Sequence, residues 1–457
     1  MSERLALIGF VNSEQVIADR IKQQTPDVIL DGYVLFPNKA FERTVDNVYR
    51  LYEENENETQ ESELAKIALC DYRAVNLGPD TAVLLLEDRL KNAGARYIGA
   101  RTDELAFELD KTKIFEIFPD STDVLPPTRI LESHSDEAIH EAINYVGEDA
   151  VIKFVGDYTD FYDDSEYRRV RYISEFGDYA DLRTFIAHSI ESSGKAIIQK
   201  RVKGQEFSYT CIVDENYGQF RLGENIFYKR RYDYDQGPLC DGTGSITVGN
   251  TLPGILNKED INFVQTDIVG RYIERMAEIT GRPPRTFLNV DLMKDESGKV
   301  YLIEVNHRQP GGHTMSNLLA GLETPVSEVL AAAQEDRLAD LEPRYKDGAS
   351  VAVTVFPEIS PRDFSENDRK PIVDIPHNLP NDDVRLYTGW VNVLDDNEHS
   401  SRVESNLTAT IIAVAHEASV DKARNAVYGR ISQLALNGSG LTYRSDIGLH
   451  VPNLILP

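Results

Sequence analysis

The chain lacks the features that would place it outside the cell or on a nucleic acid. Its 457 residues contain one tryptophan and three cysteines, and they carry a formal net charge of −28. Cys70, Cys211 and Cys240 have no metal-type spacing, and such an odd, sparse set predicts reduced thiols in an intracellular protein. The negative charge argues against a nucleic acid or an anionic membrane as partner.

Long apolar runs are missing too. No stretch approaches the about 20 apolar residues that a membrane-spanning helix needs. Met1 to Arg4 open directly into a short apolar run, with no signal-peptide pattern. We therefore expect a soluble, cytoplasmic protein, and its length predicts two to four subdomains with large cores.

A dinucleotide-binding fingerprint is also absent. Apolar strand patterns alternate with helical patterns as far as Gly99, which predicts an open, largely parallel sheet. Gly9 follows the first predicted strand, but Phe10, Val11 and Asn12 come next, where a G-x-G-x-x-G fingerprint needs further glycine. The sequence therefore disfavours a nicotinamide or flavin oxidoreductase and favours a sheet that offers one wall of a substrate site.

A predicted hairpin carries the strongest chemical signal that the chain does contain. Two apolar runs, residues 287–293 and 300–305, flank a polar turn with a glycine. Because side chains alternate along a strand, Glu304 and Asn306 share one face. Asp291 lies in the partner strand and can face them across the ladder. The hairpin therefore predicts a cluster of three oxygen-bearing side chains.

This cluster suits a hard cation that is shared with phosphates. Mg²⁺ prefers oxygen ligands, keeps several waters and takes its remaining ligands from phosphate groups. Arg308 follows on the same face, where a planar guanidinium can clamp phosphate or carboxylate. Gly311 and Gly312 then free the backbone before an apolar helix start.

Two lysines precede the hairpin. Lys153 is the single cation in an apolar strand pattern over residues 150–155. A lone desolvated ammonium is costly, so a buried lysine needs an anionic partner, and an ATP phosphate would serve. Lys111 lies in an amphipathic helix predicted over residues 103–118. A lysine on a helix surface is usually solvated, so Lys111 carries no signal by itself.

The spacing of Asp291 and Glu304-x-Asn306 resembles the metal-binding signature of the ATP-grasp ligases. The resemblance covers nearly the whole chain and is strongest from Lys111 to Arg308. It implies that Asp291, Glu304 and Asn306 hold the Mg²⁺ (or Mn²⁺) ions of ATP.

The same resemblance implies a nucleotide site built from earlier segments. Lys111, with Lys113 as substitute, and Lys153 would contact phosphate. Glu206 would accept hydrogen bonds from the ribose hydroxyls. The adenine would be read at the end of one strand by Gln199, Lys200 and Val202.

An α/β fold with three parts follows from the ATP-grasp resemblance. We expect an N-terminal α/β domain with an open parallel sheet (1–110), an ATP-grasp domain (111–345) and a small C-terminal α+β domain (346–457). The ATP-grasp domain would divide into a small lobe, about 125–205, and a large lobe, about 206–345.

A second resemblance concerns the branch of the superfamily. Lys229 opens a basic loop that is similar to an amino-acid-binding loop of the glycinamide ribonucleotide synthetases. This implies that Lys229, Arg231 and Asp233 orient the carboxylate and the amine. The C-terminal order of strand, helix and Tyr-Arg-x-Asp-Ile-Gly, residues 443–448, is similar to the same synthetases.

Three segments depart from that branch. Residues 10–14 read Phe-Val-Asn-Ser-Glu where it has Gly-Gly-Arg-Glu-His for phosphoribosylamine, and residues 309–312 read Gln-Pro-Gly-Gly where it has Gly-Asp-Pro-Glu. The Gly311-Gly312 pair, which we expect to line the substrate site, is more similar to amino-acid (dipeptide) ligases. The expected phosphate flap, 156–171, is poor in glycine, and it carries three arginines that could supply charge instead: Arg168, Arg169 and Arg171.

The resemblance implies an ATP-dependent carboxylate–amine ligase of the phosphoribosylamine–glycine ligase type, and hence a role in purine biosynthesis. A carboxylate would attack the γ-phosphate to give ADP and an acyl phosphate, and an amine would then displace phosphate. Arg308 and Lys153 would stabilise the charge in these steps. The alternatives are an amino-acid (dipeptide-type) ligase and a non-catalytic ATP-binding protein. The partners would be a small carboxylate and a small amine, with no nucleic acid or membrane, and a homodimer is one assembly considered.

Overall fold

In the computed structural model of the protein, the described residues are 3–9, 12–35, 38–51, 63–67, 72–78, 80–119, 123–155, 170–240, 242–249, 251–360, 364–365, 368–379, 381–406 and 408–449. Several expectations fall outside these ranges: those on Phe10 and Val11, on Cys70, and on residues 156–169 of the expected flap, with Arg168 and Arg169. Within the ranges, no helix combines the length and the apolar character needed to cross a membrane.

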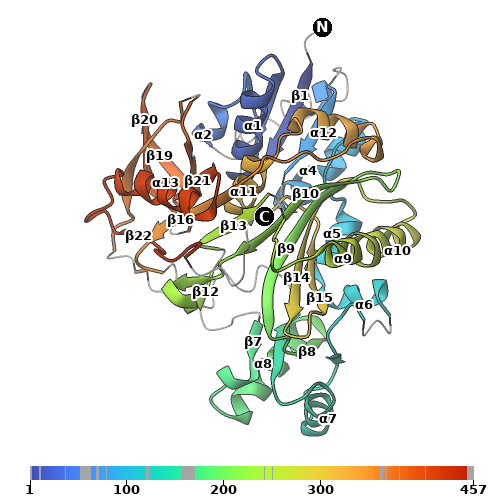
Figure 1. The fold of residues 1–457 in the computed structure, drawn as a ribbon. Coiled ribbons are helices and arrows are strands. Elements are labelled where there is room, and N and C mark those ends of the chain that lie inside the picture. Colours follow the sequence, from blue (N-terminus) through green and yellow to red (C-terminus); the bar gives the residue numbers. More distant parts are fainter. Residues whose placement is uncertain are drawn as a thin grey trace.

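The N-terminal part is an open parallel sheet, as the alternation of patterns predicts. Its strand order is β3-β2-β1-β4. The strands are β1 (Arg4–Gly9), β2 (Ile29–Val34), β3 (Asn47–Arg50) and β4 (Ala74–Leu77). The helices of this part are α1 (Asn12–Gln24), α2 (Lys39–Glu42) and α4 (Asp80–Asn92). It forms the top of the view in Figure 1, in blue.

The helix predicted over residues 103–118 is interrupted. The structure has α5 (Thr102–Leu109), a 3₁₀ turn η1 (Lys111–Lys113) and α6 (Ile114–Ile117). Asp110 is extended, with φ −97° and ψ 95°, and its side chain accepts a hydrogen bond from the Thr112 amide at 2.9 Å. An aspartate that caps a new turn competes with helix continuation, so the chain restarts at Lys111.

The small lobe is a four-stranded sheet with order β5-β8-β6-β7. Its strands are β5 (Thr128–Leu131), β6 (Ala150–Phe154), β7 (Val170–Tyr172) and β8 (Ala196–Lys200). Helices α7 (Asp136–Val146) and α8 (Tyr179–Ser193) pack on it through one apolar cluster that includes Ile139, Phe185 and Ile198. The lobe lies at the bottom of Figure 1, in teal.

A nine-stranded sheet connects the large lobe with the C-terminal part. The order is β15-β14-β9-β10-β13-β16-β21-β18, with β22 beside β16. The large-lobe strands are β9 (Gly204–Val213), β10 (Gln219–Phe227), β13 (Gly244–Val248), β14 (Thr286–Asp295) and β15 (Val300–Asn306). The C-terminal strands are β16 (Ala349–Pro357), β18 (Val384–Thr388), β21 (Ile411–Glu417) and β22 (Leu441–Tyr443). The expected domain boundary therefore precedes β16, which nevertheless pairs with β13.

The remaining elements cover this sheet or extend from it. The segment before the hairpin forms α9 (Lys258–Phe263), a π-helical stretch η5 (Val264–Gly270) and α10 (Arg271–Thr280). The later helices are α11 (Gly312–Gly321), α12 (Val326–Gln334), the 3₁₀ turn η6 (Leu338–Asp340) and α13 (Val420–Ser432). A small sheet of β17 (Ile372–Pro376), β19 (Val391–Asp396) and β20 (Ser400–Ser405) completes the C-terminal part.

Candidate active site

The predicted hairpin is formed by β14 and β15, and its register brings the expected oxygen ligands together. Asp291 lies directly opposite Glu304, and Asn289 lies opposite Asn306. Directly opposed residues of an antiparallel pair share a face, and so do residues two apart along each strand. All four side chains therefore lie on one face, which confirms the predicted pairing. Asn289 donates its amide to Asp291 Oδ1 at 3.3 Å and is a member of the cluster that the sequence argument missed.

Lysines from three different segments surround these carboxylates. Lys111 Nζ lies 3.1 Å from Glu304 Oε2, so the restart of the helix at Asp110 delivers the lysine to the hairpin. Lys229 Nζ lies 2.5 Å from Glu206 Oε1 and 3.4 Å from Asp291 Oδ2. Lys153, on β6, is buried with 8% of its surface exposed. The structure thus brings the predicted nucleotide lysines and the predicted metal ligands into one cluster.

The charges of this cluster act on one another strongly. Burial would raise the pKa of Glu304, but Lys111 and Lys153 outweigh it and lower that pKa to about 2. Burial and the nearby Lys111 charge together lower the pKa of the Lys153 ammonium to about 8, against the pull of Glu304. Burial also raises the pKa of the Asp291 carboxyl to about 6, which Lys229 only partly opposes. Near Glu304, the positive charge of the lysines therefore outweighs the negative charge of the carboxylate. At Asp291, the negative charge is only partly compensated.

The donor set fits a divalent cation such as Mg²⁺. Asp291, Glu304 and Asn306 supply two carboxylates and an amide oxygen from rigid paired strands. The amide is needed, because among the described residues no group of three or more His, Cys, Asp and Glu side chains is placed to hold a metal. Asp291 is buried, and its contact with Lys229 is long, at 3.4 Å. A metal cation beside Asp291 would therefore compensate a buried negative charge that the protein itself compensates only in part.

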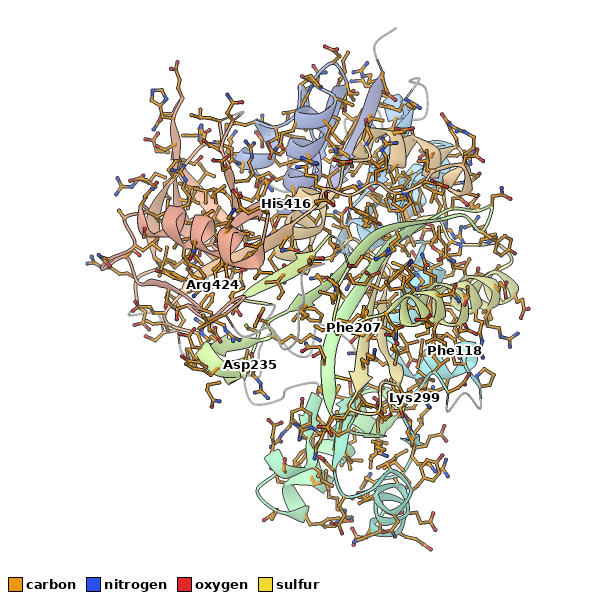
Figure 2. The ribbon with its side chains drawn as sticks, viewed as in Figure 1. Phe118, Phe207, Asp235, Lys299, His416 and Arg424 are labelled. Carbon is orange, nitrogen blue, oxygen red and sulfur yellow. The ribbon has the colours of Figure 1, made fainter. Side chains whose placement is uncertain are left out.

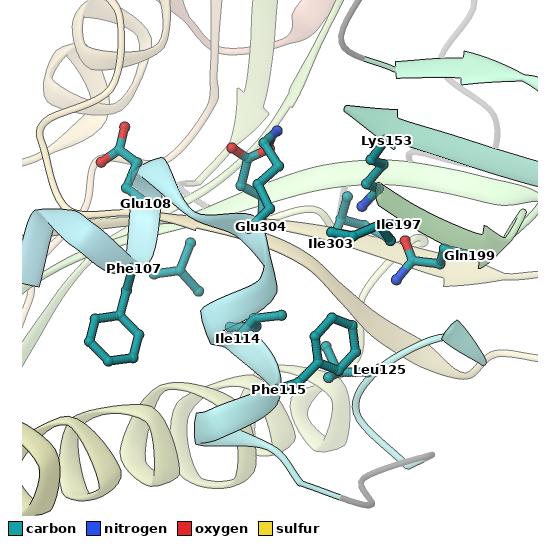
Figure 3. A pocket seen from close by; sticks show the side chains of 12 residues that line it. Phe107, Glu108, Ile114, Phe115, Leu125, Lys153, Ile197, Gln199, Ile303 and Glu304 are labelled. Atoms are coloured by element: carbon teal, nitrogen blue, oxygen red, sulfur yellow. Dashed lines mark hydrogen bonds and ion pairs between the residues drawn. The ribbon is translucent and has the colours of Figure 1, made fainter. Parts of the chain in front are cut away.

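A cavity adjoins the cluster between the two lobes. Its wall comes from the α5–α6 segment, from β6 and β8 of the small lobe and from β15 (Figure 3). Phe115 and Leu125 line one side, whereas Lys153 and Glu304 lie on the other, with Ile197 next to Lys153. A cavity with an apolar end and a cationic end suits an aromatic ligand that carries an anionic tail.

Comparisons with known proteins agree with this geometry. Residues 182–312 match the family described as phosphoribosylglycinamide synthetase, ATP-grasp (A) domain. The solved structure of phosphoribosylamine–glycine ligase from Thermotoga maritima superposes with a TM-score of 0.72 at 17% identity, covering 97% of this chain and 100% of that one. The chain therefore has the ATP-grasp fold.

Curated proteins with sequences similar to this chain include phosphoribosylamine–glycine ligases. Phosphoribosylamine–glycine ligase of Mycobacterium leprae is 26% identical over 426 residues, which are 92% of this chain and 93% of that enzyme. The ligase of Methanopyrus kandleri is 26% identical over 263 residues, which are 56% of this chain and 55% of that enzyme. In the second case the match spans little more than half of the relative's length.

The expected adenine-binding segment of this ATP-grasp chain lies at the cavity. Gln199 is buried, lines the cavity and donates its amide to Thr128 Oγ1 at 2.9 Å. Lys200 ends β8 with an exposed side chain, and its backbone amide donates to Pro127 O at 2.8 Å. Val202 follows it in the connection to β9. The structure therefore places Gln199 on the wall and leaves the Lys200 side chain in solvent.

Arg308 has a partner that the sequence argument did not identify. Its Nε donates to Glu108 Oε1 at 2.8 Å, and its side chain remains 31% exposed. Glu108, at the end of α5, is buried and also lines the cavity. Its other oxygen, Oε2, accepts from the His307 amide at 2.8 Å. An acid among the apolar residues of the predicted helix was the available signal for Glu108, but nothing local identifies its partner 200 residues away.

Two of the residues expected to orient substrate contact other parts of the protein, and their expected role remains a prediction. Arg231 is buried, stacks over the Phe356 ring at 4.6 Å and donates to the carbonyl oxygen of Pro357. Asp233 accepts from Ser445 Oγ at 2.6 Å. Both contacts are with the C-terminal part. Charges in a basic loop look alike in sequence whether they face a ligand or a neighbouring domain.

The two glycines after Arg308 begin α11. Gly311 caps the helix, and the Gly312 amide donates to Asn12 Oδ1 at 3.0 Å. A Cβ at residue 312 would lie 2.6 Å from Asn12 Cγ, so only glycine permits this approach to the N-terminal domain. The expectation that Gly311 and Gly312 line the substrate site remains a prediction, to which the structure adds a packing reason for Gly312.

Proposed function

We propose that this ATP-grasp protein is an ATP-dependent carboxylate–amine ligase that forms an amide through an acyl phosphate. The observation that carries the proposal is the convergence of Lys111, Lys153 and Lys229 on the face of the hairpin that presents Asp291 and Glu304. Alternating cations and carboxylates beside an apolar cavity match what a triphosphate with its cation requires. The similarity to phosphoribosylamine–glycine ligases of M. leprae and M. kandleri supports the same reading.

The nucleotide would occupy this cavity with its base at the apolar end. Phe115 and Leu125 would contact the adenine ring. Glu206, now paired with Lys229, would accept from the ribose hydroxyls. Lys111 and Lys153 would neutralise phosphate oxygens, because a buried ammonium with a lowered pKa gains most from an anionic partner.

We infer Mg²⁺ as the cation and Asp291, Glu304 and Asn306 as its protein ligands. When bound, it would supply positive charge that neutralises the phosphate groups during phosphoryl transfer. The protein's own contribution is to hold three oxygen donors on paired strands, so that their geometry does not have to be organised during the reaction. Lys111 pairs with Glu304, and Lys229 lies 3.4 Å from Asp291.

The chemistry divides into two displacements. A substrate carboxylate oxygen attacks the γ-phosphorus, the bond to the β,γ-bridging oxygen breaks, and ADP leaves. The amine nitrogen then attacks the acyl carbon, its proton is lost to solvent or base, and phosphate leaves as the amide forms. Arg308, which donates Nε to Glu108 Oε1, would stabilise the acyl phosphate with its positive charge.

One observation favours a second candidate for the amine substrate. Glu14, at the start of α1, is fully buried, and Gln309 donates to its Oε1 and to Ser13 Oγ. Glu14 belongs to the segment that takes the place of the sugar-phosphate loop, and a buried anion there disfavours a phosphate ester. An amine without phosphate, as in an amino-acid ligase, is therefore the alternative to phosphoribosylamine.

The experiment is ADP and phosphate release with Mg-ATP against a grid of carboxylates and amines. The grid includes glycine with phosphoribosylamine, and pairs of free amino acids. Turnover that needs both substrates supports the ligase, and the active pair decides between the two candidates and assigns or removes a role in purine biosynthesis. Mg-ATP binding with no turnover for any pair would favour a non-catalytic ATP-binding protein, and a purified protein that binds no Mg-ATP would refute the proposal.

A further inference from the structure

Residues 228–243 form a loop that leaves the large sheet between β10 and β13. We call it the 228–243 loop; it contains β11 (Arg230–Tyr232), η4 (Asp233–Asp235) and β12 (Gln236–Leu239). Its base is closed by the Tyr228 amide on Gly244 O at 2.9 Å and by the Thr243 amide on Tyr228 O at 2.8 Å. Lys229, at that base, reaches Glu206 and Asp291 in the candidate site. The tip of the loop points the other way, toward the C-terminal part, where Figure 2 labels Asp235.

The C-terminal part grips this loop through one buried arginine. Arg444, which is 1% exposed, donates Nη1 to Asp235 Oδ1 at 2.7 Å and to Arg230 O at 3.1 Å. Nε and Nη2 pair with both oxygens of Asp446, at 2.7 and 2.6 Å. The guanidinium also lies 4.9 Å from the Tyr228 ring centroid. Arg444 therefore holds the tip of the loop and the backbone of the residue that follows Lys229.

Neighbours of Arg444 hold the same loop at further points. The Tyr234 amide donates to Asp446 Oδ2 at 2.7 Å. The Ser445 amide and hydroxyl donate to the two carboxylate oxygens of Asp233, at 2.8 and 2.6 Å. Consecutive residues of the Tyr443–Gly448 segment thus hold consecutive residues of the loop.

The loop tip has a backbone that would not persist without such contacts. Tyr234 and Asp235 have φ values of 57° and 54°, the left-handed region that side-chain-bearing residues rarely adopt. Tyr232 and Tyr234 are also half or more exposed, at 50% and 67%, so apolar burial does not hold the tip. Strained residues of this kind remain only where surrounding contacts determine them. Here those contacts come from Arg444 and Asp446.

We propose that Arg444, Ser445 and Asp446 are positioning residues for the ligase, and that they fix the 228–243 loop so that Lys229 reaches Glu206 and Asp291. The proposal rests on the proposed function in so far as those two carboxylates bind the nucleotide and its cation. The C-terminal part is therefore required for the site, although no side chain of it is placed in the catalytic cluster.

The structural half of the test is chymotrypsin cleavage after Tyr232 and Tyr234, located by mass spectrometry. Asp235→Asn and Ser445→Ala each remove one hold on the loop at an exposed position, so folding is retained. We expect each to raise the cleavage rate at these tyrosines about tenfold, because losing one charge-assisted hydrogen bond shifts the local opening equilibrium by that order. The matched control is Asp396→Asn, which breaks an ion pair between the C-terminal part and Arg43 without touching the loop.

The functional half is a double-mutant cycle on Mg-ATP affinity, measured by calorimetry. Lys229→Met and Asp235→Asn should each weaken Mg-ATP binding, and the double variant should be no weaker than Lys229→Met alone, because both changes remove the same contact. Asp396→Asn should leave the affinity unchanged. Thermal unfolding of every variant separates these effects from a general loss of stability.

The outcomes test the two parts of the proposal separately. If Asp235→Asn and Ser445→Ala leave the cleavage rate at Tyr232 and Tyr234 unchanged, the proposal that the C-terminal segment fixes the loop is wrong. Faster cleavage with additive effects on Mg-ATP affinity would overturn the link to Lys229. The cleavage assay needs no nucleotide, so wild-type protein that fails to bind Mg-ATP would refute the proposed function without affecting the result for the grip.

Discussion

The carboxylate of Glu108 binds the side chain of Arg308 and also the backbone amide of the residue before it. Oε1 accepts from Arg308 Nε at 2.8 Å, while Oε2 accepts from the amide of the preceding residue, His307, at 2.8 Å. One buried carboxylate thereby fixes both the direction of the guanidinium and the path of the chain that carries it. Through this contact α5, far away in sequence, takes part in the candidate site.

Glu108→Gln should lower kcat by roughly 10- to 100-fold. The reason is that even a small displacement of the Arg308 guanidinium would remove its alignment with the acyl phosphate. A glutamine keeps only one acceptor oxygen for two donors. Mg-ATP affinity should stay near the wild-type value. The measurement is steady-state ADP release together with calorimetric ATP binding. Unchanged kcat would leave Glu108 with a packing role only, and Arg308→Lys provides the comparison for loss of the planar fork.

Glu304→Gln and Asn306→Ala should each reduce turnover by at least about 100-fold with the fold intact, since each removes a ligand from a rigid strand pair. The control is Glu296→Gln, the same chemical change in the exposed turn of the same hairpin. Circular dichroism and thermal unfolding check the fold. Normal turnover in both site variants would disprove the metal assignment.

Lys153→Met should raise the KM for ATP about tenfold or more, because a buried phosphate contact to a charged donor is lost. Lys200→Met changes the neighbouring strand β8 in the same way, but its side chain is exposed, so we expect less than about a twofold change. Equal effects of the two substitutions would contradict the assignment of Lys153 to the phosphates.

Binding of ATP should be accompanied by proton uptake near pH 8.5. Burial and Lys111 lower the pKa of Lys153 to about 8, so above that pH the free protein holds this lysine mostly neutral. A bound phosphate favours the ammonium and raises its pKa, so a proton enters with the nucleotide, and affinity falls as pH rises through 8 to 9. Calorimetry in two buffers of different ionisation enthalpy measures the uptake. Lys153→Met should abolish it, and an uptake that persists in this variant would assign it to another group.

Magnesium removal should separate the cation from the nucleotide. With Mg²⁺ present, ATP at about 100 times its Kd should stabilise the protein by about 2.7 kcal/mol through mass action, which is visible as a rise in Tm. Chelation with EDTA should remove most of that rise, and Mn²⁺ should restore it. Glu304→Gln should show a small rise that is insensitive to EDTA. An equal rise with and without Mg²⁺ in the wild type would contradict the cation site.

Local patterns in the sequence were sufficient for the hairpin. Alternation of side chains and a polar turn determine which residues of β14 and β15 share a face, and the register confirms the pairing of Asp291 with Glu304. The N-terminal parallel sheet was predictable for the same reason, since strand and helix periods alternate along its length.

Contacts between distant segments were not predictable in this way. In the sequence, Glu108 is one acid in a predicted helix. Arg231 and Asp233 belong to a basic loop for which the sequence indicates contact with substrate. Their partners, Arg308 and the C-terminal segments, lie hundreds of residues away. The break at Asp110 was missed because the apolar period continues through it, although the aspartate itself favours a new helix start.

The pairing of β13 with β16 has a consequence for any attempt to express the domains separately. Five residue pairs join these strands, from Gly244 with Val353 to Val248 with Ala349. A truncation after residue 345 would leave β13 as an unprotected edge strand whose neighbours are buried and apolar. Such an edge invites aggregation through intermolecular strand pairing, so the ATP-grasp domain of this chain is not expected to be a soluble unit without the strand that follows it.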